Sequence, residues 1–146
     1  MIPIILFTVL SLDQLTKFLI SKNLSILESV PVIQHVFHLT LVANRGAAFG
    51  ILRNQTLLFI FTSLLAIVLI LSNLRKNRHR GLYSFSLSLI LSGALGNLID
   101  RLRFGYVIDF LDFRIWPVFN IADSAITIGA ILLGWSILFQ KDKLSA

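Results

Sequence analysis

The chain has 146 residues, of which 56% are hydrophobic and only 14% charged, and its mean hydropathy is +0.86. Soluble domains balance apolar and charged residues more evenly, so this composition excludes an ordinary soluble protein and indicates a lipid environment. The net charge of +6 comes from basic residues that are scattered or flank apolar segments, which favours membrane topology over a nucleic-acid partner. The absence of cysteine excludes disulfides, a thiolate nucleophile and cysteine metal ligands.

Four apolar segments approach the length of about 20 helical residues that crosses a hydrocarbon core of about 30 Å. They cover residues 1–20, 56–74, 82–99 and 122–139, and they predict a membrane all-α protein that forms a single domain over residues 1–146. The first segment contains Asp13 and Lys17 and lacks both the basic start and the small-residue cleavage pattern of a signal peptide. We therefore expect this segment to be a retained transmembrane helix.

The two long connectors, residues 21–55 and 100–119, contain strand-like patterns. Apolar and polar side chains alternate from Phe37 to Leu41, which predicts a half-buried strand, and Asn44-Arg45-Gly46 is typical of a turn. In residues 107–113, alternate side chains divide between the two faces of a second possible strand. Strand-like backbone cannot face lipid, so we expect the connectors to form a small strand-rich extracytoplasmic platform over one end of the helices.

Basic residues predict the orientation of the helices in the membrane. The short connector at residues 75–80 is dense in Lys and Arg, and Lys141 and Lys143 follow the last apolar segment. By the positive-inside rule, both termini are then cytoplasmic. The two long connectors on the opposite side together contain six Lys and Arg residues, as many as the proposed cytoplasmic side. The prediction therefore rests on charge density and on closeness to the ends of the spans.

Most of the acidic residues gather, in this topology, near one face of the membrane. The chain has only seven. Five of them share that face: Asp13, Asp100, Asp109, Asp112 and Asp123. Ionisable groups at membrane depth are costly, and each is a candidate for function.

Asp109 and Asp123 are the pair that best suits catalysis, because one lies on the strand-like connector and the other opens the last span. Two carboxylates that share one proton can activate a water and polarise a carbonyl without a metal or a covalent intermediate. Simpler interpretations remain for both. Asn120 and Asp123 have the spacing of helix N-cap and N3 residues, and Asp109 could be a solvated loop acid.

Other polar residues suit supporting roles. Asp13 and Lys17 are one helical turn apart, which favours a structural ion pair over a direct role. Asn97, Asp100 and Arg101 end the third span, where Asn can bond a peptide backbone and Arg can grip a carbonyl or extend to the interface.

Small residues recur every four positions along the third span and predict close approach of another helix. They are Ser84, Ser88, Ser92 and Gly96, and the series ends at Asp100.

A metal site is not expected. His35 and His38, placed three apart on a strand, would point to opposite faces, and the sequence contains no HExxH motif. The pattern therefore favours chemistry that needs no cofactor.

Five motifs in order make the chain resemble the lipoprotein signal peptidase family, also called signal peptidase II, whose members are intramembrane aspartyl proteases. They are Asp13-Gln14-Leu15-Thr16-Lys17, Asn44-Arg45-Gly46-Ala47-Ala48-Phe49-Gly50, the run from Gly93 to Arg101, Val107-Ile108-Asp109-Phe110, and Phe119-Asn120-Ile121-Ala122-Asp123. Each motif alone is weak, but five in sequence make the resemblance specific.

The resemblance implies that Asp109 and Asp123 are the catalytic dyad. It also implies that the substrate site is lined or supported by Asn44, Gly46, Asn97, Arg101, Asn120 and Ala122. Family members cut the signal peptide from bacterial prolipoproteins, just before a diacylglyceryl-modified cysteine, at the outer face of the cytoplasmic membrane. Membrane lipid as a partner, inhibition by globomycin-type cyclic peptides and the lack of a cofactor follow from the same resemblance, and we expect a monomer.

Two other functions are compatible with a small helical membrane protein. A proton-coupled transporter or relay would also place Asp and Lys in helices, but it predicts acids near the midplane and inverted repeats. A non-enzymatic assembly factor would use the stripe of small residues to bind partner helices, and it would tolerate the loss of Asp109 or Asp123.

Overall fold

The computed structural model describes residues 2–46, 52–76 and 81–139. Over these ranges the chain forms four helices that are long and apolar enough to cross a membrane. They are α1 (Ile2–Asn23), α2 (Thr56–Lys76), α3 (Gly81–Phe104) and α4 (Ile121–Phe139). Each predicted span corresponds to one helix, which confirms the predicted membrane helices. The helices α1 and α3 continue beyond the predicted ends, into polar residues that suit the membrane interface.

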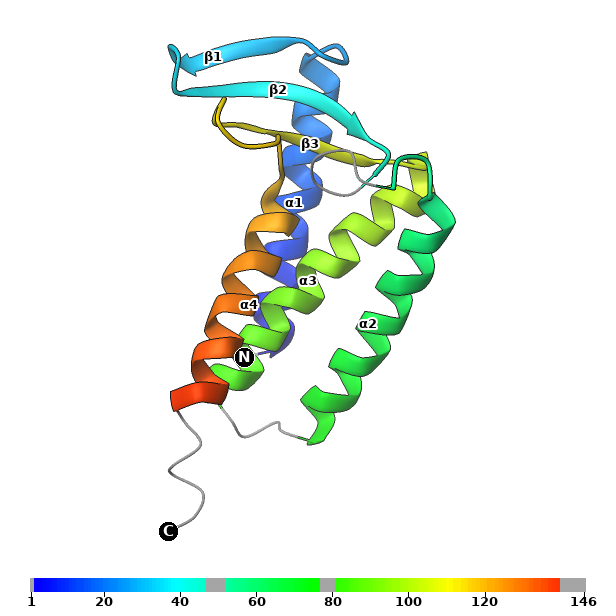
Figure 1. Cartoon of the computed structure of the whole chain (residues 1–146), viewed down its shortest axis with the longest axis vertical. Coiled ribbons are helices and arrows are strands. Elements are labelled where there is room, and N and C mark those ends of the chain that lie inside the picture. The colour runs from blue at the N-terminus through cyan, green and yellow to red at the C-terminus, as the bar shows by residue number, and fades with distance from the viewer. Residues whose placement is uncertain (1, 47–51, 77–80, 140–146) are drawn as a thin grey trace.

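The helix α3 lies at the centre of the bundle and packs against α1, α2 and α4 (Figure 1). In its most apolar stretch 56% of the residues are buried, compared with 11% in α1 and in α2, which face lipid over most of their surface. The predicted stripe of small residues is buried along its whole length. The hydroxyls of Ser88 and Ser92 donate to carbonyls one turn earlier, so close packing leaves them satisfied.

Glycines allow the closest helix contacts. A Cβ atom at Gly96 on α3 would lie 2.5 Å from the Asp13 Oδ2 atom on α1. At Gly129 on α4, a Cβ atom would lie 2.8 Å from the backbone oxygen of Ser86 on α3. These positions therefore require the absence of a side chain.

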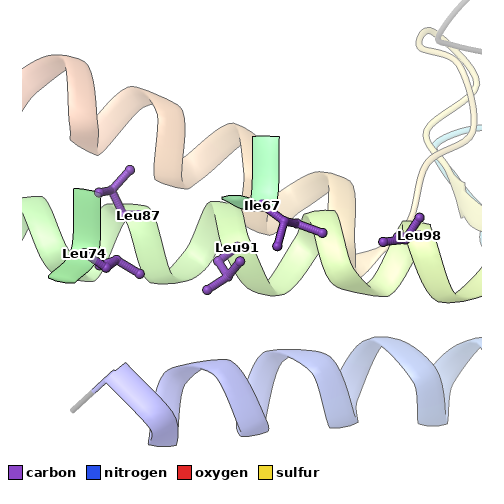
Figure 2. Close-up of a cluster of buried hydrophobic side chains, with 5 residues drawn as sticks. All are labelled: Ile67, Leu74, Leu87, Leu91 and Leu98. Atoms are coloured by element: carbon purple, nitrogen blue, oxygen red, sulfur yellow. The ribbon is translucent and has the colours of Figure 1, made fainter. Parts of the chain in front are cut away.

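The other side of α3 forms an apolar contact with α2. Ile67 and Leu74 of α2 are buried with leucines of α3, and Figure 2 shows them together: Ile67, Leu74, Leu87, Leu91 and Leu98. The glycines of α3, in contrast, lie against α1 and α4, where Gly96 meets Asp13 and Ala122 and Gly93 meets Ala122.

The connectors form the predicted platform, a small antiparallel sheet over one end of the bundle (Figure 1). Within the described ranges it contains β1 (Ser29–Ile33), β2 (Phe37–Asn44) and β3 (Val107–Asp112), in the order β1-β2-β3. The edge strand β1 was not predicted. His35 lies in the turn between β1 and β2 with a φ of 63°, so the placement of both histidines on one strand was wrong.

The strand β3 differs from a half-exposed strand because both of its faces are covered. Val107, Ile108, Asp109 and Phe110 are all buried, although alternate residues point to opposite sides. The strand packs against α1 and α3, pairs with β2 along one edge and meets Phe119 at the other. Asp109 is therefore not the solvated loop acid of the simpler interpretation.

Some predicted features lie outside the described residues. They are the rest of the second motif at residues 47–50, the basic residues at 77–80, and Lys141 and Lys143. Arg75 and Lys76 are described, and they occupy the last turn of α2, at the end of the bundle away from the sheet (Figure 1).

Candidate functional site

Asp109 lies at the centre of β3, where the strand meets the helices, and it is 1% exposed. Both of its carboxylate oxygens accept hydrogen bonds from amide side chains. The Asn120 Nδ2 atom donates to Oδ1 at 2.6 Å, and the Asn44 Nδ2 atom donates to Oδ2 at 2.8 Å. The carboxyl group is thus held by two neutral donors from the segment before α4 and from β2.

Asp123 is the third residue of α4, and a reciprocal capping box fixes its side chain. The Asn120 Oδ1 atom accepts from the Asp123 backbone N–H at 2.8 Å, while the Asp123 Oδ2 atom accepts from the Asn120 backbone N–H at 3.3 Å. The other oxygen, Oδ1, accepts from the Asn97 Nδ2 atom at 2.7 Å. The helix-cap interpretation of Asp123 is therefore correct, and the cap directs the carboxylate toward the Asp109 network.

The charge of Asp123 acts on the carboxyl group of Asp109. Burial, followed by the negative charge of Asp123, raises the pKa of Asp109 to about 7, against the opposing hydrogen bonds from Asn44 and Asn120. Asp109 therefore keeps its proton in a large share of molecules near neutral pH. A neutral acid beside a second carboxyl group is the arrangement that shared-proton catalysis requires.

Behind the pair lies a buried charged trio made of Asp13, Lys17 and Asp100. The Lys17 ammonium is 2% exposed and contacts the Asp13 Oδ2 atom at 2.9 Å and the Asp100 Oδ2 atom at 2.8 Å. The predicted ion pair within α1 is confirmed, and α3 supplies a second carboxylate. The Lys17 Nζ atom also donates to the Asn97 Oδ1 atom at 3.1 Å, which connects the trio to Asp123.

The trio's carboxylates hold the backbone just before each of the paired aspartates. The Asp13 Oδ1 atom accepts from the Ala122 N–H at 2.9 Å, and the Asp100 Oδ2 atom accepts from the Ile108 N–H at 3.1 Å. Gln14, which was in a quoted motif but was not predicted as a site residue, donates to the Asp100 Oδ1 atom at 3.0 Å. These bonds connect α1 and α3 to the start of α4 and to β3.

A cavity of about 230 Å³ opens onto the paired aspartates. Predicted residues line it: Asn44, Gly46, Asn97, Arg101, Asp109 and Asp123. The Arg101 guanidinium lies 4.8 Å from the centre of the Phe59 ring on α2, and this cation–π contact holds the side chain at the wall of the cavity.

An apolar groove of about 580 Å³ continues from this cavity along α4. The cavity and the groove share the residues Trp116, Phe119, Asp123 and Thr127, and Phe113, Ile115, Ser124 and Ile128 complete the groove. Ile115 is 93% exposed, so the loop before α4 presents apolar surface beside the groove.

Asp112 is the acid of the predicted group that the structure does not bring to the pair. Burial alone would raise its pKa, but hydrogen bonds from Thr40 and from Arg114, together with the Arg114 charge, outweigh burial and lower it. Asp112 therefore stabilises the sheet and the loop that follows it.

Sequence reasoning missed Trp116, Phe119 and Thr127 as lining residues. The signal for Thr127 was its place one helical turn after Asp123, on the same face of α4. No spacing pointed to Trp116, because its position depends on the path of an irregular loop.

Fold and site together define a multi-pass membrane protein in which two paired carboxyl groups, one of them fully buried, lie where a small sheet meets the helix bundle. The family model described as Signal peptidase (SPase) II matches residues 5–139. This chain belongs to the signal peptidase II family and is a peptidase.

Individual relatives agree with this assignment. The chain is 52% identical over 143 residues to the lipoprotein signal peptidase of Halothermothrix orenii (strain H 168 / OCM 544 / DSM 9562), covering 98% of each chain. It is 54% identical over 136 residues to that of Moorella thermoacetica (strain ATCC 39073 / JCM 9320), covering 92% of this chain and 91% of the relative.

Solved structures share the fold. One described as a bacterial membrane enzyme, determined by the in meso method at 2.3 Å resolution, superposes with a TM-score of 0.92 at 34% identity. The match covers 99% of this chain and 92% of the other. Family membership does not favour the transporter alternative.

Proposed function

We propose that the chain is an endopeptidase that removes the signal peptide from bacterial prolipoproteins, cutting before the diacylglyceryl-modified cysteine, with Asp109 and Asp123 as its catalytic dyad. The observation that supports this most strongly is the pairing of the two carboxyl groups through a shared asparagine at the wall of an open cavity. The names of the relatives indicate the substrate class.

In this mechanism one aspartate is ionised and the other is protonated. The ionised carboxylate takes a proton from a water, whose oxygen bonds to the scissile carbonyl carbon, while the neutral carboxyl donates a hydrogen bond to the carbonyl oxygen. Transfer of the proton to the leaving nitrogen breaks the C–N bond and regenerates the dyad. No metal, cofactor or covalent intermediate takes part.

The surrounding residues then have separate tasks. Arg101, Asn44 and Gly46 line the cavity where they can hold the substrate backbone, and Asn97 and Asn120 orient the dyad. Ala122 anchors the start of α4 through its backbone. The apolar groove beside Phe119 suits the hydrophobic parts of the lipidated substrate.

The whole chain would work as one domain in the bacterial cytoplasmic membrane, with the dyad near the outer face and both termini in the cytoplasm. Arg75 and Lys76, at the end of α2 away from the sheet, support this orientation. We further propose that the protein acts as a monomer among membrane lipids and that globomycin-type cyclic peptides inhibit it.

The test is cleavage of a diacylglyceryl-modified prolipoprotein by purified protein in detergent or liposomes. We expect Asp109→Asn and Asp123→Asn each to lower kcat by at least about a thousandfold, because each removes one half of the acid–base pair. The parent should be insensitive to chelators and should be inhibited by globomycin.

Asp112→Asn is the matched control, since Asp112 shares β3 with Asp109 but bonds Thr40 and Arg114 instead. It should cleave at close to the parental rate. Normal cleavage by a folded Asp109→Asn or Asp123→Asn variant would rule out the dyad, and no cleavage by the folded parent would rule out the proposed substrate.

A further inference from the structure

Two of the asparagine amides around the dyad are oriented by backbone donors. The Asn44 Oδ1 atom accepts from the Gly46 N–H at 2.9 Å, and the Asn120 Oδ1 atom accepts from the Asp123 N–H at 2.8 Å. A backbone N–H can only donate, so the oxygen of each amide must face it and the NH2 group must face the carboxyl group of Asp109.

Asn97 is oriented differently, because the group that donates a hydrogen bond to its amide oxygen is a side chain and not a backbone N–H. Its Oδ1 atom accepts from the Lys17 ammonium at 3.1 Å, and its NH2 group donates to the Asp123 Oδ1 atom at 2.7 Å. The Asn120 Nδ2 atom also lies 3.1 Å from the Asn97 Oδ1 atom, but its two hydrogens serve three acceptors. The three hydrogens of Lys17, in contrast, match its three acceptors one to one.

We propose that Lys17 is a positioning residue of the proteolytic site, which holds the Asn97 amide with its NH2 group toward Asp123 and thereby keeps Asp123 as the ionised, proton-accepting member of the dyad. This inference rests on the dyad proposed above. Without the ammonium, rotation of the amide would place its oxygen against the Asp123 carboxylate and remove a donor from it.

The charges around the dyad agree with this division of roles. From α1 come Lys17 and Asp13, from α3 Asp100 and Arg101, and the dyad itself comes from β3 and α4. The amide that donates to Asp123 is held directly by the Lys17 cation, whereas Asp109 is connected to Lys17 only through a further amide, that of Asn120. Asp109, whose pKa is raised to about 7, is then the neutral acid.

The experiment needs a variant that removes Lys17 without leaving two buried carboxylates unbalanced, which would be expected to unfold the protein. Lys17→Met combined with Asp100→Asn keeps the formal charge of the trio at −1, and the amide oxygen introduced by Asp100→Asn can still accept from the Ile108 N–H. Asn97→Leu is the second variant, since it removes the connection to Asp123 while the trio stays intact.

Gln14→Leu is the matched control for a purely structural effect. The Gln14 amide bonds Asp13, the Gly96 carbonyl and Asp100, so the change disturbs the carboxylates of the same buried network while the bonds of Asn97 to Lys17 and Asp123 stay in place. We expect a lower melting temperature for this variant, with kcat within about twofold of the parent.

For the Lys17→Met/Asp100→Asn variant we expect kcat to fall at least about tenfold with KM within about twofold, and the acidic limb of the pH–rate profile to move to higher pH. Asn97→Leu should give the same changes. A protein that carries all three substitutions should have a kcat within about twofold of the Lys17→Met/Asp100→Asn variant, because the loss of Lys17 and the loss of Asn97 act through the same bond.

An unchanged pH profile in folded Asn97→Leu, or equal kcat losses in the Lys17 and Gln14 variants at matched melting temperature, would overturn the positioning role. So would additive losses on combining the changes. Activity in Asp109→Asn or Asp123→Asn would overturn the dyad itself, and this separates the two failures.

Discussion

At the scale of single residues, the most unusual feature is an acid buried in a network made largely of asparagines. Asp109 is 1% exposed, and its hydrogen bonds from Asn44 and Asn120 offset only part of the cost of removing a charge from water. The protein therefore loses stability when Asp109 ionises, in exchange for a proton available near neutral pH.

This cost predicts a pH-dependent gain in stability for Asp109→Asn. The pKa of Asp109 rises from 3.8 in the unfolded chain to about 7 in the folded protein, so its stabilising contribution is complete below about pH 4 and is lost as the pH rises through 7. Asn cannot ionise. The melting temperature of the variant, relative to the parent in the same detergent, should be higher at pH 8 than at pH 5.

Asp112→Asn supplies the contrast for this measurement. The folded pKa of Asp112 is lowered, so its contribution is present above its unfolded pKa and is lost only as the pH falls through the folded value. Between pH 5 and 8 the difference in melting temperature between Asp112→Asn and the parent should stay constant. If the difference in melting temperature between Asp109→Asn and the parent also stayed constant, Asp109 would not ionise within this pH range in the folded protein.

The sequence was enough to group the paired aspartates with Asn44, Asn97 and Asn120, because the family resemblance selects these positions and the structure places them together. The bond between Lys17 and Asn97 could not be predicted. Helical spacing describes only partners within α1, and the rotation of α1 against α3 depends on tertiary packing.

At the scale of the elements, the contact between α3 and α4 depends on places where no side chain intervenes. Gly129 of α4 lies against the Ser86 and Ile90 backbone of α3, and backbone atoms cannot move aside. The stripe of small residues predicted that another helix approaches α3 closely, but it includes neither Ser86 nor Ile90, and it did not point to the glycine on α4 that faces them.

Two glycines on α4 allow a controlled test of this packing. Gly129→Ala should destabilise the protein by about 1–3 kcal/mol, because its Cβ atom would overlap the α3 backbone. At Gly134 a Cβ atom has nothing within 4 Å, so Gly134→Ala should be neutral or stabilising by up to about 1 kcal/mol. Thermal unfolding in detergent measures both, and equal effects would contradict the close contact.

The edge strand β1 shows why part of the sheet escaped prediction. Its five residues, Ser29–Ile33, are all exposed, and Pro31 interrupts the pattern that defines a strand. Proline is tolerated there because β1 is an edge strand, with a register shift between Pro31 and Ile33. Only the pairing with β2 identifies this segment as a strand.

At the scale of the whole molecule, the two ends of the helix bundle carry different features. The sheet and the paired aspartates lie at one end, while α1 begins and α4 ends at the other (Figure 1). Arg75 and Lys76 end α2 on the same side as those helix ends. Because these ends should lie on opposite sides of the membrane, one labelling position at each end is enough to test the proposed orientation.

Single cysteines at the two ends should report opposite sides of the membrane, and the parent has no cysteine of its own. In intact cells, a membrane-impermeant maleimide should label Gln34→Cys, in the exposed turn between β1 and β2, but not Lys76→Cys. Lys76→Cys should react only after the membrane is permeabilised. The reverse pattern would place the dyad on the cytoplasmic side.

The buried trio of Asp13, Lys17 and Asp100 has a consequence for biosynthesis. The ribosome makes α1 long before α3, and during that interval Asp13 is the only trio partner that Lys17 can have. An unpaired charge within a membrane helix costs up to about 3 kcal/mol on insertion, which is the value at the helix centre. Because Asp13 and Lys17 are one helical turn apart, they can pair with each other, and α1 enters the bilayer as a nearly neutral helix. Once α3 is made, Asp100 supplies the second partner of Lys17 and holds α1 in the bundle.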